Sequence, residues 1–405
     1  MLKEVLSAES ERLAILEKAS EAKYVTMVEG WIPEANVEPA MLHLKEELDI
    51  IFVDVRAPAE AEEPPTKLNN LRPLRPFEVV VGLFGIPRYG GWDPTPLIAY
   101  SFAVFFGLML GDVVYAVGLI LVARFLLPSF VDDPESDGFR LFQRVIYISS
   151  VVALIVGAMT GSWLGDLSEL FGIPGEWLAL VRPIREVLLD PISFIVIAVV
   201  IGLVHVNIGH LLGFIKGAQE GNKGAMLSRA GIFVLQIFGI PLLLYTIFDF
   251  ALLVSPFPSA MFGYLTLVGL VMIIVASFMQ MKGLGVIFWL FDTTGILGDV
   301  MSYCRLAGVG LATFYLAFSF NMMANMVFDA LSGALPGIFG IAIGGIMAII
   351  ILVFGHLINL ALSALGAFIH SLRLCFVEFM FKFYEGGGMQ YEPFCLKPRT
   401  FVVVG

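Results

Sequence analysis

Two arginines stand inside long apolar stretches of this chain, where a positive charge is expensive. Arg305 lies in the run Ser302-Tyr-Cys-Arg-Leu-Ala-Gly-Val-Gly-Leu311, within a predicted apolar helix over residues 295–330. Arg373 lies in His370-Ser-Leu-Arg-Leu374, near the end of a second long apolar helix. An arginine at the centre of a membrane helix costs roughly 2.5–3.5 kcal/mol on insertion scales, so such residues usually serve a function. The pair predicts a protein that handles ions or protons within the lipid bilayer.

The helical face around Arg305 carries only small residues. At steps of three and four residues these neighbours are Gly298, Ser302, Gly308 and Ala312. Small side chains let a second helix approach closely in lipid, so we expect this face to lie against a neighbour, with the guanidinium group projecting from it. The alternative is ordinary helix packing with an arginine that snorkels to the interface. Arg305 lies about ten residues into the predicted helix, roughly 15 Å from its start. Its side chain would have to extend a long way to reach the interface, which favours a function.

A stripe of polar and small residues recurs along the last apolar helix at spacings of three and four. Its members are His356, Asn359, Ser363, Gly366, His370 and Arg373. One continuous face of this kind on an apolar rod is typical of a helix that lines an aqueous path, although a single histidine is more often a hydrogen-bonded structural residue. We therefore expect this stripe to be wet and the opposite face to be dry. Glu378 is predicted to lie roughly 140° around the helix from Arg373, as an entry-funnel carboxylate or as a surface charge.

Other polar groups point to packing rather than to chemistry. His205, Asn207 and His210 cluster in one apolar span, and they favour interhelical hydrogen bonds over a metal site because no Cys or carboxylate lies in register. The three cysteines show neither metal-ligand spacing nor a disulfide framework. The chain has no phosphate-binding loop and no Ser/His/Asp order. We predict no metal, no cofactor and no catalytic site for ATP hydrolysis in this chain.

The composition is that of an integral membrane protein. Of 405 residues, 58% are hydrophobic and 15% are charged, against about 45–50% and 25% in a soluble domain. The net charge of −11 argues against nucleic acid as a partner. These values predict a mainly α, polytopic membrane protein.

We count eight apolar spans, since roughly 20 residues cross a bilayer. Two lie within residues 96–127 and turn at Gly111-Asp112, and the other six cover residues 142–164, 192–215, 230–251, 260–280, 295–330 and 336–383. The last two are longer than one crossing requires, so we expect them to be strongly tilted or to protrude.

The first 72 residues are polar and predict a small α/β lobe. An amphipathic helix over residues 2–19 precedes a strand-like stretch at 24–30, a helix at 37–48 and a second strand-like stretch at 50–55. Such a lobe is too short to close a core alone. The acidic, proline-rich residues 57–65 are typical of an extended linker. We divide the chain into a partial lobe with its linker (1–72), a membrane domain (73–395) and a tail (396–405).

Lysines and arginines in the loops predict the orientation of the chain. One side of the membrane would carry ten of them and the other side only Arg182 and Arg185. The ten are Arg124, Arg140, Arg144, Lys216, Lys223, Arg229, Lys282, Lys382, Lys397 and Arg399. Because positive loops stay in the cytoplasm, both termini are expected there, in agreement with an even number of spans.

Several motifs occur in an order that resembles one known family. They are Arg72-Pro-Leu-Arg-Pro-Phe77, Asp93-Pro-Thr-Pro96, Phe106-Gly-Leu-Met-Leu-Gly-Asp112, Ser302-Tyr-Cys-Arg-Leu306, His370-Ser-Leu-Arg-Leu374 and Val377-Glu-Phe-Met-Phe-Lys-Phe-Tyr-Glu-Gly-Gly-Gly388. The chain resembles the membrane subunit of rotary V/A-type ATPases and ATP synthases, which is subunit a or subunit I, from about residue 20 to 394. The resemblance implies a cytoplasmic arm of several hundred residues, whereas about 72 residues stand here before the membrane domain, so we expect a shortened arm.

The resemblance implies the stator part of an ion-driven rotary motor in the cell membrane. In that family the last two of eight membrane helices face a ring of c-type subunits, so Arg305 and Arg373 would face the ring carboxylate. The half-channels would be lined by Ser302, His356, Asn359, Ser363, His370 and Glu378. Some relatives carry a carboxylate where Ser363 stands, so the far-side half-channel would use other groups. The implied partners are the ring, the peripheral stalk (through residues 24–33), and the central-stalk and ATPase subunits.

Two other classes of function are compatible with the sequence. A stand-alone, proton-coupled secondary transporter could also use intramembrane arginine and histidine, although such folds often contain inverted repeats and none is evident here. A purely structural membrane anchor would not need two buried arginines. If the chain belongs to a rotary ATPase, the transported ion is H⁺ or Na⁺.

Overall fold

Apolar helices build the larger of two units in the computed structural model of the chain. The structure describes residues 25–48, 50–59, 62–168, 171–248, 259–335 and 337–393, together with 10, 13 and 20–22. The membrane unit comprises Asn70–Phe84 and Asp93–Glu385. The smaller unit comprises Met1–Asn69, Gly85–Trp92 and Gly386–Gly405.

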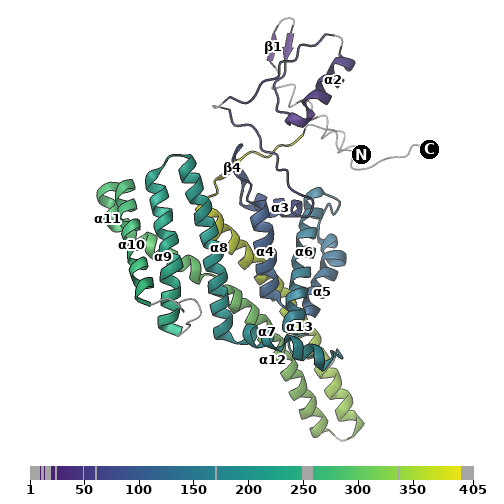
Figure 1. Cartoon of the computed structure of the whole chain (residues 1–405). Coiled ribbons are helices and arrows are strands. Elements are labelled where there is room, and N and C mark those ends of the chain that lie inside the picture. Colours follow the sequence, from purple (N-terminus) through teal and green to yellow (C-terminus); the bar gives the residue numbers. More distant parts are fainter. Residues whose placement is uncertain are drawn as a thin grey trace, which may run out of the picture. The chain divides into compact units, whose positions relative to one another are not determined.

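Seven helical runs among the described residues are long and apolar enough to cross a membrane, and one shorter apolar helix, α4, adds an eighth. In chain order the helices of the membrane unit are α3 (Glu78–Phe84), α4 (Thr95–Leu110), α5 (Val113–Leu121, continued by short π and 3-10 turns to Phe130), α6 (Asp137–Thr160), α7 (Gly175–Leu189), α8 (Pro191–Gln219), α9 (Lys223–Phe248), α10 (Ser259–Met281), α11 (Gly285–Met301), α12 (Cys304–Ala334) and α13 (Ile338–Arg373). Figure 1 shows them as a bundle. The chain is a polytopic, mainly α membrane protein, as its composition predicts.

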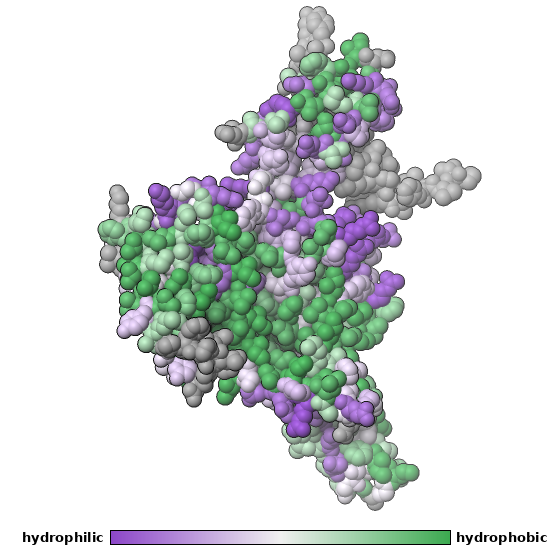
Figure 2. All heavy atoms as spheres, in the orientation of Figure 1, coloured by the Kyte–Doolittle hydropathy of each residue, from purple (hydrophilic) through white to green (hydrophobic). Residues whose placement is uncertain are grey.

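Hydrophobic residues form a broad band across the membrane unit, with hydrophilic residues gathered above and below this band (Figure 2). Many large apolar side chains of the membrane unit are exposed, including Val104, Leu267, Val353 and Leu362. Such a surface would be unstable in water and is typical of helices that face lipid or another membrane protein.

A break at Gly111-Asp112 separates α4 from α5, at the turn that the sequence predicts. Gly111 has φ 39° and ends α4 in the left-handed conformation, which glycine adopts without a Cβ penalty. The buried carboxylate of Asp112 caps α5 by accepting hydrogen bonds from the backbone N–H groups of Val114 and Tyr115. Its second oxygen accepts from Ser162 Oγ at 2.8 Å and from the backbone N–H of Gly165 at 2.9 Å. Asp112 therefore ties the start of α5 to the loop after α6.

The predicted helix over residues 295–330 is not continuous, and this part of the prediction is wrong. It is divided into α11 and α12 by a turn at Ser302 and Tyr303. Tyr303 is fully buried and packs against Gly202 of α8, where an added Cβ would lie 2.5 Å from the tyrosine ring. At this turn the backbone N–H groups of Tyr303, Arg305 and Leu306 donate to carbonyls three residues back instead of four, and the hydroxyl of Ser302 donates to the carbonyl of Gly298, a bond that often bends helices. Arg305 becomes the second residue of α12 rather than a mid-helix residue.

The long pair α12 and α13 packs together along its length and extends beyond the neighbouring helices of the membrane unit (Figure 1). α4 packs against α6, α12 and α13, and α8 packs against α9, α11 and α12. The buried core between these helices is rich in aromatic residues, with Phe102, Phe106, Tyr303 and Phe379 among its members. The ends of α11, α12 and α13 are thereby held against α4 and α8.

Two helical features were not expected from the sequence. α7 lies between the predicted spans 142–164 and 192–215, where no helix was expected, and carries Arg182 and Arg185. The last apolar stretch is α-helical only to Arg373, and it continues as a π-helical turn (Leu374–Phe379) and a 3-10 turn (Met380–Lys382).

The smaller unit contains two short antiparallel pairs of strands, β1 (Ser20–Ala22) with β2 (Val25–Met27) and β3 (Ile86–Pro87) with β4 (Gly386–Gly388). The helix predicted at residues 37–48 is present as α2 (Val37–Glu47). The strand predicted at residues 50–55 is wrong, because this stretch forms no strand. The predicted helix at 2–19 lies almost wholly outside the described residues.

Candidate functional site

The turn between α11 and α12 positions Arg305. The backbone N–H of Arg305 donates to the carbonyl of Ser302, and its Nε donates to the same carbonyl at 3.0 Å. The side chain of Ser302 in turn donates to the carbonyl of Gly298 at 2.8 Å. These bonds fix the base of the guanidinium group, while the side chain as a whole keeps 20% of its surface exposed.

The predicted small-residue face beside Arg305 is not covered by any part of the chain that the structure describes. Gly298, Gly308 and Ala312 are exposed. A Cβ added at Gly298 or Gly308 would meet open space. An open, shallow face of this kind flanks the arginine on both adjoining helices.

A π-helical turn brings Glu378 back toward Arg373. In a regular α-helix, residues five apart lie on different faces, and the sequence prediction that Glu378 points away from Arg373 is wrong. The widened turn over Leu374–Phe379 begins directly after Arg373, and the backbone N–H of Met380 donates to the carbonyl of Cys375, five residues back. Because π geometry places residues i and i+5 almost above one another, Glu378 Oε1 lies 3.7 Å from Arg373 Nε.

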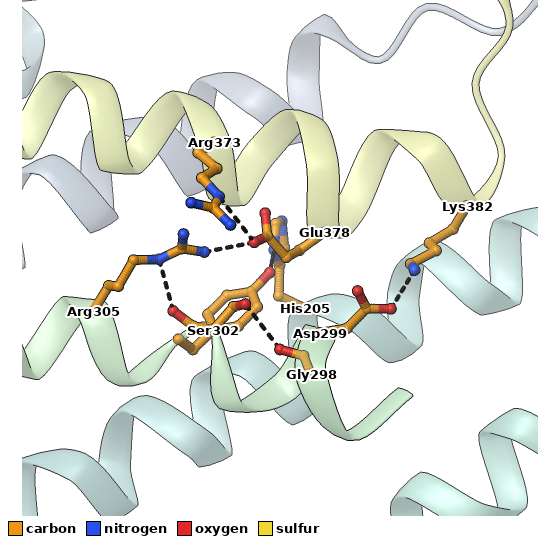
Figure 3. Close-up of polar contacts among 9 residues, drawn as sticks. His205, Gly298, Asp299, Ser302, Arg305, Arg373, Glu378 and Lys382 are labelled. Carbon is orange, nitrogen blue, oxygen red and sulfur yellow. Dashed lines mark hydrogen bonds and ion pairs between the residues drawn. The ribbon is translucent and has the colours of Figure 1, made fainter. Parts of the chain in front are cut away.

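Glu378 also contacts Arg305, so one carboxylate joins both arginines (Figure 3). Arg305 Nη2 donates to Glu378 Oε1 at 2.5 Å. The side chain of Glu378 is only 3% exposed, whereas that of Arg373 is 58% exposed. The second carboxylate oxygen, Oε2, is buried and has no hydrogen-bond partner among the described residues. The structure therefore brings together three residues that the sequence singled out separately.

A second ion pair lies one turn further along. Lys382 Nζ donates to the carboxylate of Asp299 on α11, and both side chains are largely buried (Figure 3). This pair joins the end of α11 to the 3-10 turn after α13. Sequence reasoning missed it, although two single charges at the ends of apolar stretches were a usable signal.

The histidines of α8 form the interhelical hydrogen bonds that the sequence predicts. His205 Nδ1 lies 2.5 Å from the hydroxyl of Tyr303, and its ring stacks on Phe379 with centroids 4.1 Å apart. His210 Nδ1 lies 3.2 Å from Nη1 of Arg229 on α9. Asn207 instead donates to a backbone carbonyl of its own helix. His205 thus supports the tyrosine of the α11–α12 turn and the residue next to Glu378.

The predicted stripe on α13 falls into two parts, of which the first is a buried hydrogen-bond network. Asn359 is fully buried, and its Nδ2 donates to the Tyr115 hydroxyl at 2.9 Å and to the carbonyl of Thr313 at 3.0 Å. Its Oδ1 accepts from Ser363 Oγ at 3.1 Å, and Ser363 Oγ accepts from Thr313 Oγ1 at 2.9 Å. Hydroxyl and amide groups of three helices satisfy one another here.

The network continues from Tyr115 toward the loop after α6. The Tyr115 hydroxyl lies 2.8 Å from His356 Nδ1, and His356 Nε2 lies 2.9 Å from Asn321 Oδ1. Asn321 Nδ2 donates to Asp166 Oδ1 at 2.8 Å. A chain of direct hydrogen bonds therefore runs from Ser363, in the middle of α13, to a carboxylate in the loop between α6 and α7.

The second part of the stripe is more open. Gly366 and His370 are half-buried, and a Cβ added at Gly366 would meet only Val309, at 3.9 Å. His370 Nδ1 has no hydrogen-bond partner among the described residues. This part leads to Arg373 and Glu378.

Residues 294–396 match the V-type ATPase 116kDa subunit family. Over nearly the whole chain there is similarity to proteins named A-type ATP synthase subunit I. The chain is 32% identical to the one from Pyrococcus abyssi, over 98% of its own length and 57% of the relative's. It is also 32% identical to the one from Methanocaldococcus jannaschii, over 96% and 58%, respectively. The chain is a relative of the subunit I proteins. It spans a little over half the length of these relatives.

The region that matches the subunit family contains most of the charged site. Asp299, Arg305, Arg373, Glu378 and Lys382 all fall within residues 294–396. The partners of the α13 stripe on α5, Tyr115, and in the loop after α6, Asp166, lie outside it. No motif or spacing marks these two residues, and only the folded helices show their connection to His356 and Asn321.

Proposed function

We propose that this chain is the ion-translocating stator subunit of a rotary V/A-type ATPase or ATP synthase, with no catalytic site of its own. The relatives that carry the subunit I name support this proposal. The observation that carries it is the open face of small residues beside Arg305, together with a guanidinium group that a buried carboxylate holds in place. The stand-alone transporter considered from the sequence finds no support in these similarities.

In this proposal a ring of c-type subunits turns against α12 and α13. A ring carboxylate that crosses lipid must be neutral, because a bare charge there is very expensive. When it arrives opposite Arg305 and Arg373, the positive charge favours its ionised form, and it releases its ion. Two offset half-channels then connect this position to the two sides of the membrane. An ion can cross only if the ring turns.

The polar groups of α13 supply candidates for both paths. The network from Ser363 through Asn359 and His356 to Asp166 is the candidate for the far-side path. Glu378, Ser302 and His370, near the other end of α13 and the α11–α12 turn, are candidates for the near side. Both termini are cytoplasmic in this arrangement, and the lobe around residues 24–33 contacts the peripheral stalk of the complex. The central-stalk and ATPase subunits complete it.

The test is the Arg305→Ala variant in the assembled complex, reconstituted into vesicles. We expect ATP-driven ion pumping to be abolished while the complex still assembles. The matched control is Arg182→Ala, because Arg182 is 74% exposed and pairs with Glu186 on the surface of α7. Pumping at the wild-type rate by the Arg305→Ala complex would contradict the proposal.

A further inference from the structure

The charges around the arginine pair do not cancel. Arg305 and Arg373 carry two positive charges, and Glu378, which contacts both, carries one negative charge. Asp299 and Lys382 form a separate pair of opposite charges, and Arg229 on α9 adds a positive charge on the Asp299 side of it. The other titratable groups near Glu378 are Tyr303, Cys375 and Asp299. His205 lies beside Glu378 in Figure 3, and His370 lies near the two arginines. With the tyrosine, the cysteine and the two histidines neutral, Arg305, Arg373 and Glu378 together keep one net positive charge.

The carboxylate and the two guanidinium groups differ in how far they are buried. Glu378 is 3% exposed, Arg305 is 20% exposed and Arg373 is 58% exposed. Glu378 therefore contacts the arginines from the protein side. A guanidinium group has five N–H donors, and Arg305 uses one on Ser302 and one on Glu378. Donors remain for a second carboxylate that approaches from the exposed side.

We propose that Glu378 is the internal counter-ion of the two arginines and limits the charge that they present to a ring carboxylate to one net positive. This inference rests on the proposed function. A single arriving carboxylate makes the cluster neutral, with two positive and two negative charges. When that carboxylate leaves, the arginines stay paired with Glu378 and are not left bare beside lipid. Glu378 thus weakens the attraction between the arginines and the ring carboxylate, so that the ring carboxylate can take up an ion and leave this position.

Removing the negative charge of Glu378 should change the ion dependence of pumping in one predictable direction. In the Glu378→Gln variant the arginines present two net positive charges, so the ionised ring carboxylate is held more tightly. An opposite charge within about 4–6 Å shifts a carboxyl by about one to three pH units. We expect half-maximal ATP-driven pumping to require about tenfold more coupling ion, which for H⁺ is a shift of about one pH unit toward acid.

The experiment compares pumping against ion concentration in reconstituted complexes that carry Glu378→Gln, Glu385→Gln or the double change Arg373→Gln with Glu378→Gln. Glu385→Gln removes the same charge from a residue that is 69% exposed and pairs with Lys216, and it should leave the ion dependence unchanged. The double variant restores one net positive charge. It should return the ion concentration for half-maximal pumping to the wild-type value, although the maximal rate falls because Arg373 is lost. This comparison also stands when the single variant does not assemble.

Three outcomes would overturn the inference. One is an unchanged ion dependence in Glu378→Gln, even with a uniformly lower rate, which is what a merely structural role would give. Another is a double variant that keeps the shift of the single variant. The third is the failure of both the single and the double variant to assemble into the complex, because Glu378 would then be needed for folding. The Arg305→Ala complex in the same assay separates the two proposals. Normal pumping there contradicts the proposed function, whereas lost pumping there with an unshifted Glu378→Gln contradicts only this inference.

Discussion

The hydroxyl of Tyr115 lies 2.8 Å from Nδ1 of His356 and forms the central link in a buried chain of hydrogen bonds. His356 Nε2 faces the carbonyl oxygen of Asn321, whose own amide group donates to Asp166. An acceptor at Nε2 requires that this nitrogen carry the proton, so Nδ1 accepts from Tyr115. The Tyr115 oxygen then accepts from Asn359. In each hydrogen bond between Ser363 and Asp166, the donor is then on the Ser363 side and the acceptor is on the Asp166 side.

Loss of the Tyr115 hydroxyl should destabilise the membrane unit. In Tyr115→Phe, His356 Nδ1 and one N–H of Asn359 lose their partner in a buried site. A buried polar group without a partner costs about 1–3 kcal/mol, and hydrogen bonds within membranes are worth about 1–2 kcal/mol at most. We expect a fall of about 1–2 kcal/mol in the free energy of unfolding, measured by denaturation of the purified complex in detergent.

Tyr147→Phe provides the matched control for this prediction. The Tyr147 hydroxyl is buried on α6 and has no hydrogen-bond partner among the described residues. Its removal should leave stability unchanged or slightly raised. Equal losses from the two variants would mean that the Tyr115 hydrogen bonds add no stability.

Gly157 allows α6 to approach the α4–α5 junction. A Cβ at this position would lie 2.6 Å from the backbone nitrogen of Val113 and 2.7 Å from the backbone carbon of Asp112. Backbone atoms cannot rotate away as the end of a side chain can, so Gly157→Ala must push two helices apart. Overpacking of this kind costs about 1–3 kcal/mol, and we expect a lower thermal midpoint of the complex.

Gly138→Ala on the same helix is the comparison for this change. A Cβ at Gly138 meets nothing within 4 Å, and alanine is the better helix former by about 1 kcal/mol. Gly138→Ala should therefore be neutral or stabilising. A thermal midpoint for Gly157→Ala at or above that of the wild type would show that the close approach is absent.

The sequence predicts the helices of this fold well because each apolar span carries its own signal. Hydrophobic length alone marks α6, α8, α9 and α10 to within several residues. The turn at Gly111-Asp112 is also visible, since glycine followed by a capping residue is a local signal. By contrast, the turn at Ser302 and Tyr303 contains neither Gly nor Pro. At this turn Tyr303 packs against Gly202 of α8, about a hundred residues earlier in the chain, and no local pattern in the sequence shows that contact.

The candidate site was predictable only in its charged members. Arg305, Arg373 and Glu378 stand out because a charge in an apolar stretch is costly. That Glu378 joins the two arginines depends on a π-helical turn, for which the sequence of this segment offers no recognisable signal. The partners of the α13 stripe, Tyr115 and Asn321, are ordinary residues until α5, α12 and α13 are packed together.

The orientation of the chain in the membrane can be tested with single cysteines in intact cells. The ten-to-two distribution of loop lysines and arginines predicts that Glu176, at the start of α7, is external and that Lys223, at the start of α9, is cytoplasmic. An impermeant thiol reagent should label Glu176→Cys and spare Lys223→Cys. The native cysteines are replaced beforehand, and lysed cells provide the control for accessibility. The reverse pattern of labelling would contradict the topology.

Cysteines along α13 test whether water reaches the half of the stripe next to the arginines. Position 366 is half-buried beside open space, position 365 is 59% exposed on the apolar surface, and Ser363 is held in the buried network. If the stripe lines an aqueous path, Gly366→Cys should react with a small water-soluble thiol reagent, and this reaction should slow ion flux. Ser363→Cys should react more slowly, because water must first enter the network, and Leu365→Cys should not react. Similar rates at positions 365 and 366, or no reaction at 363 and 366, would show that this face is ordinary helix packing.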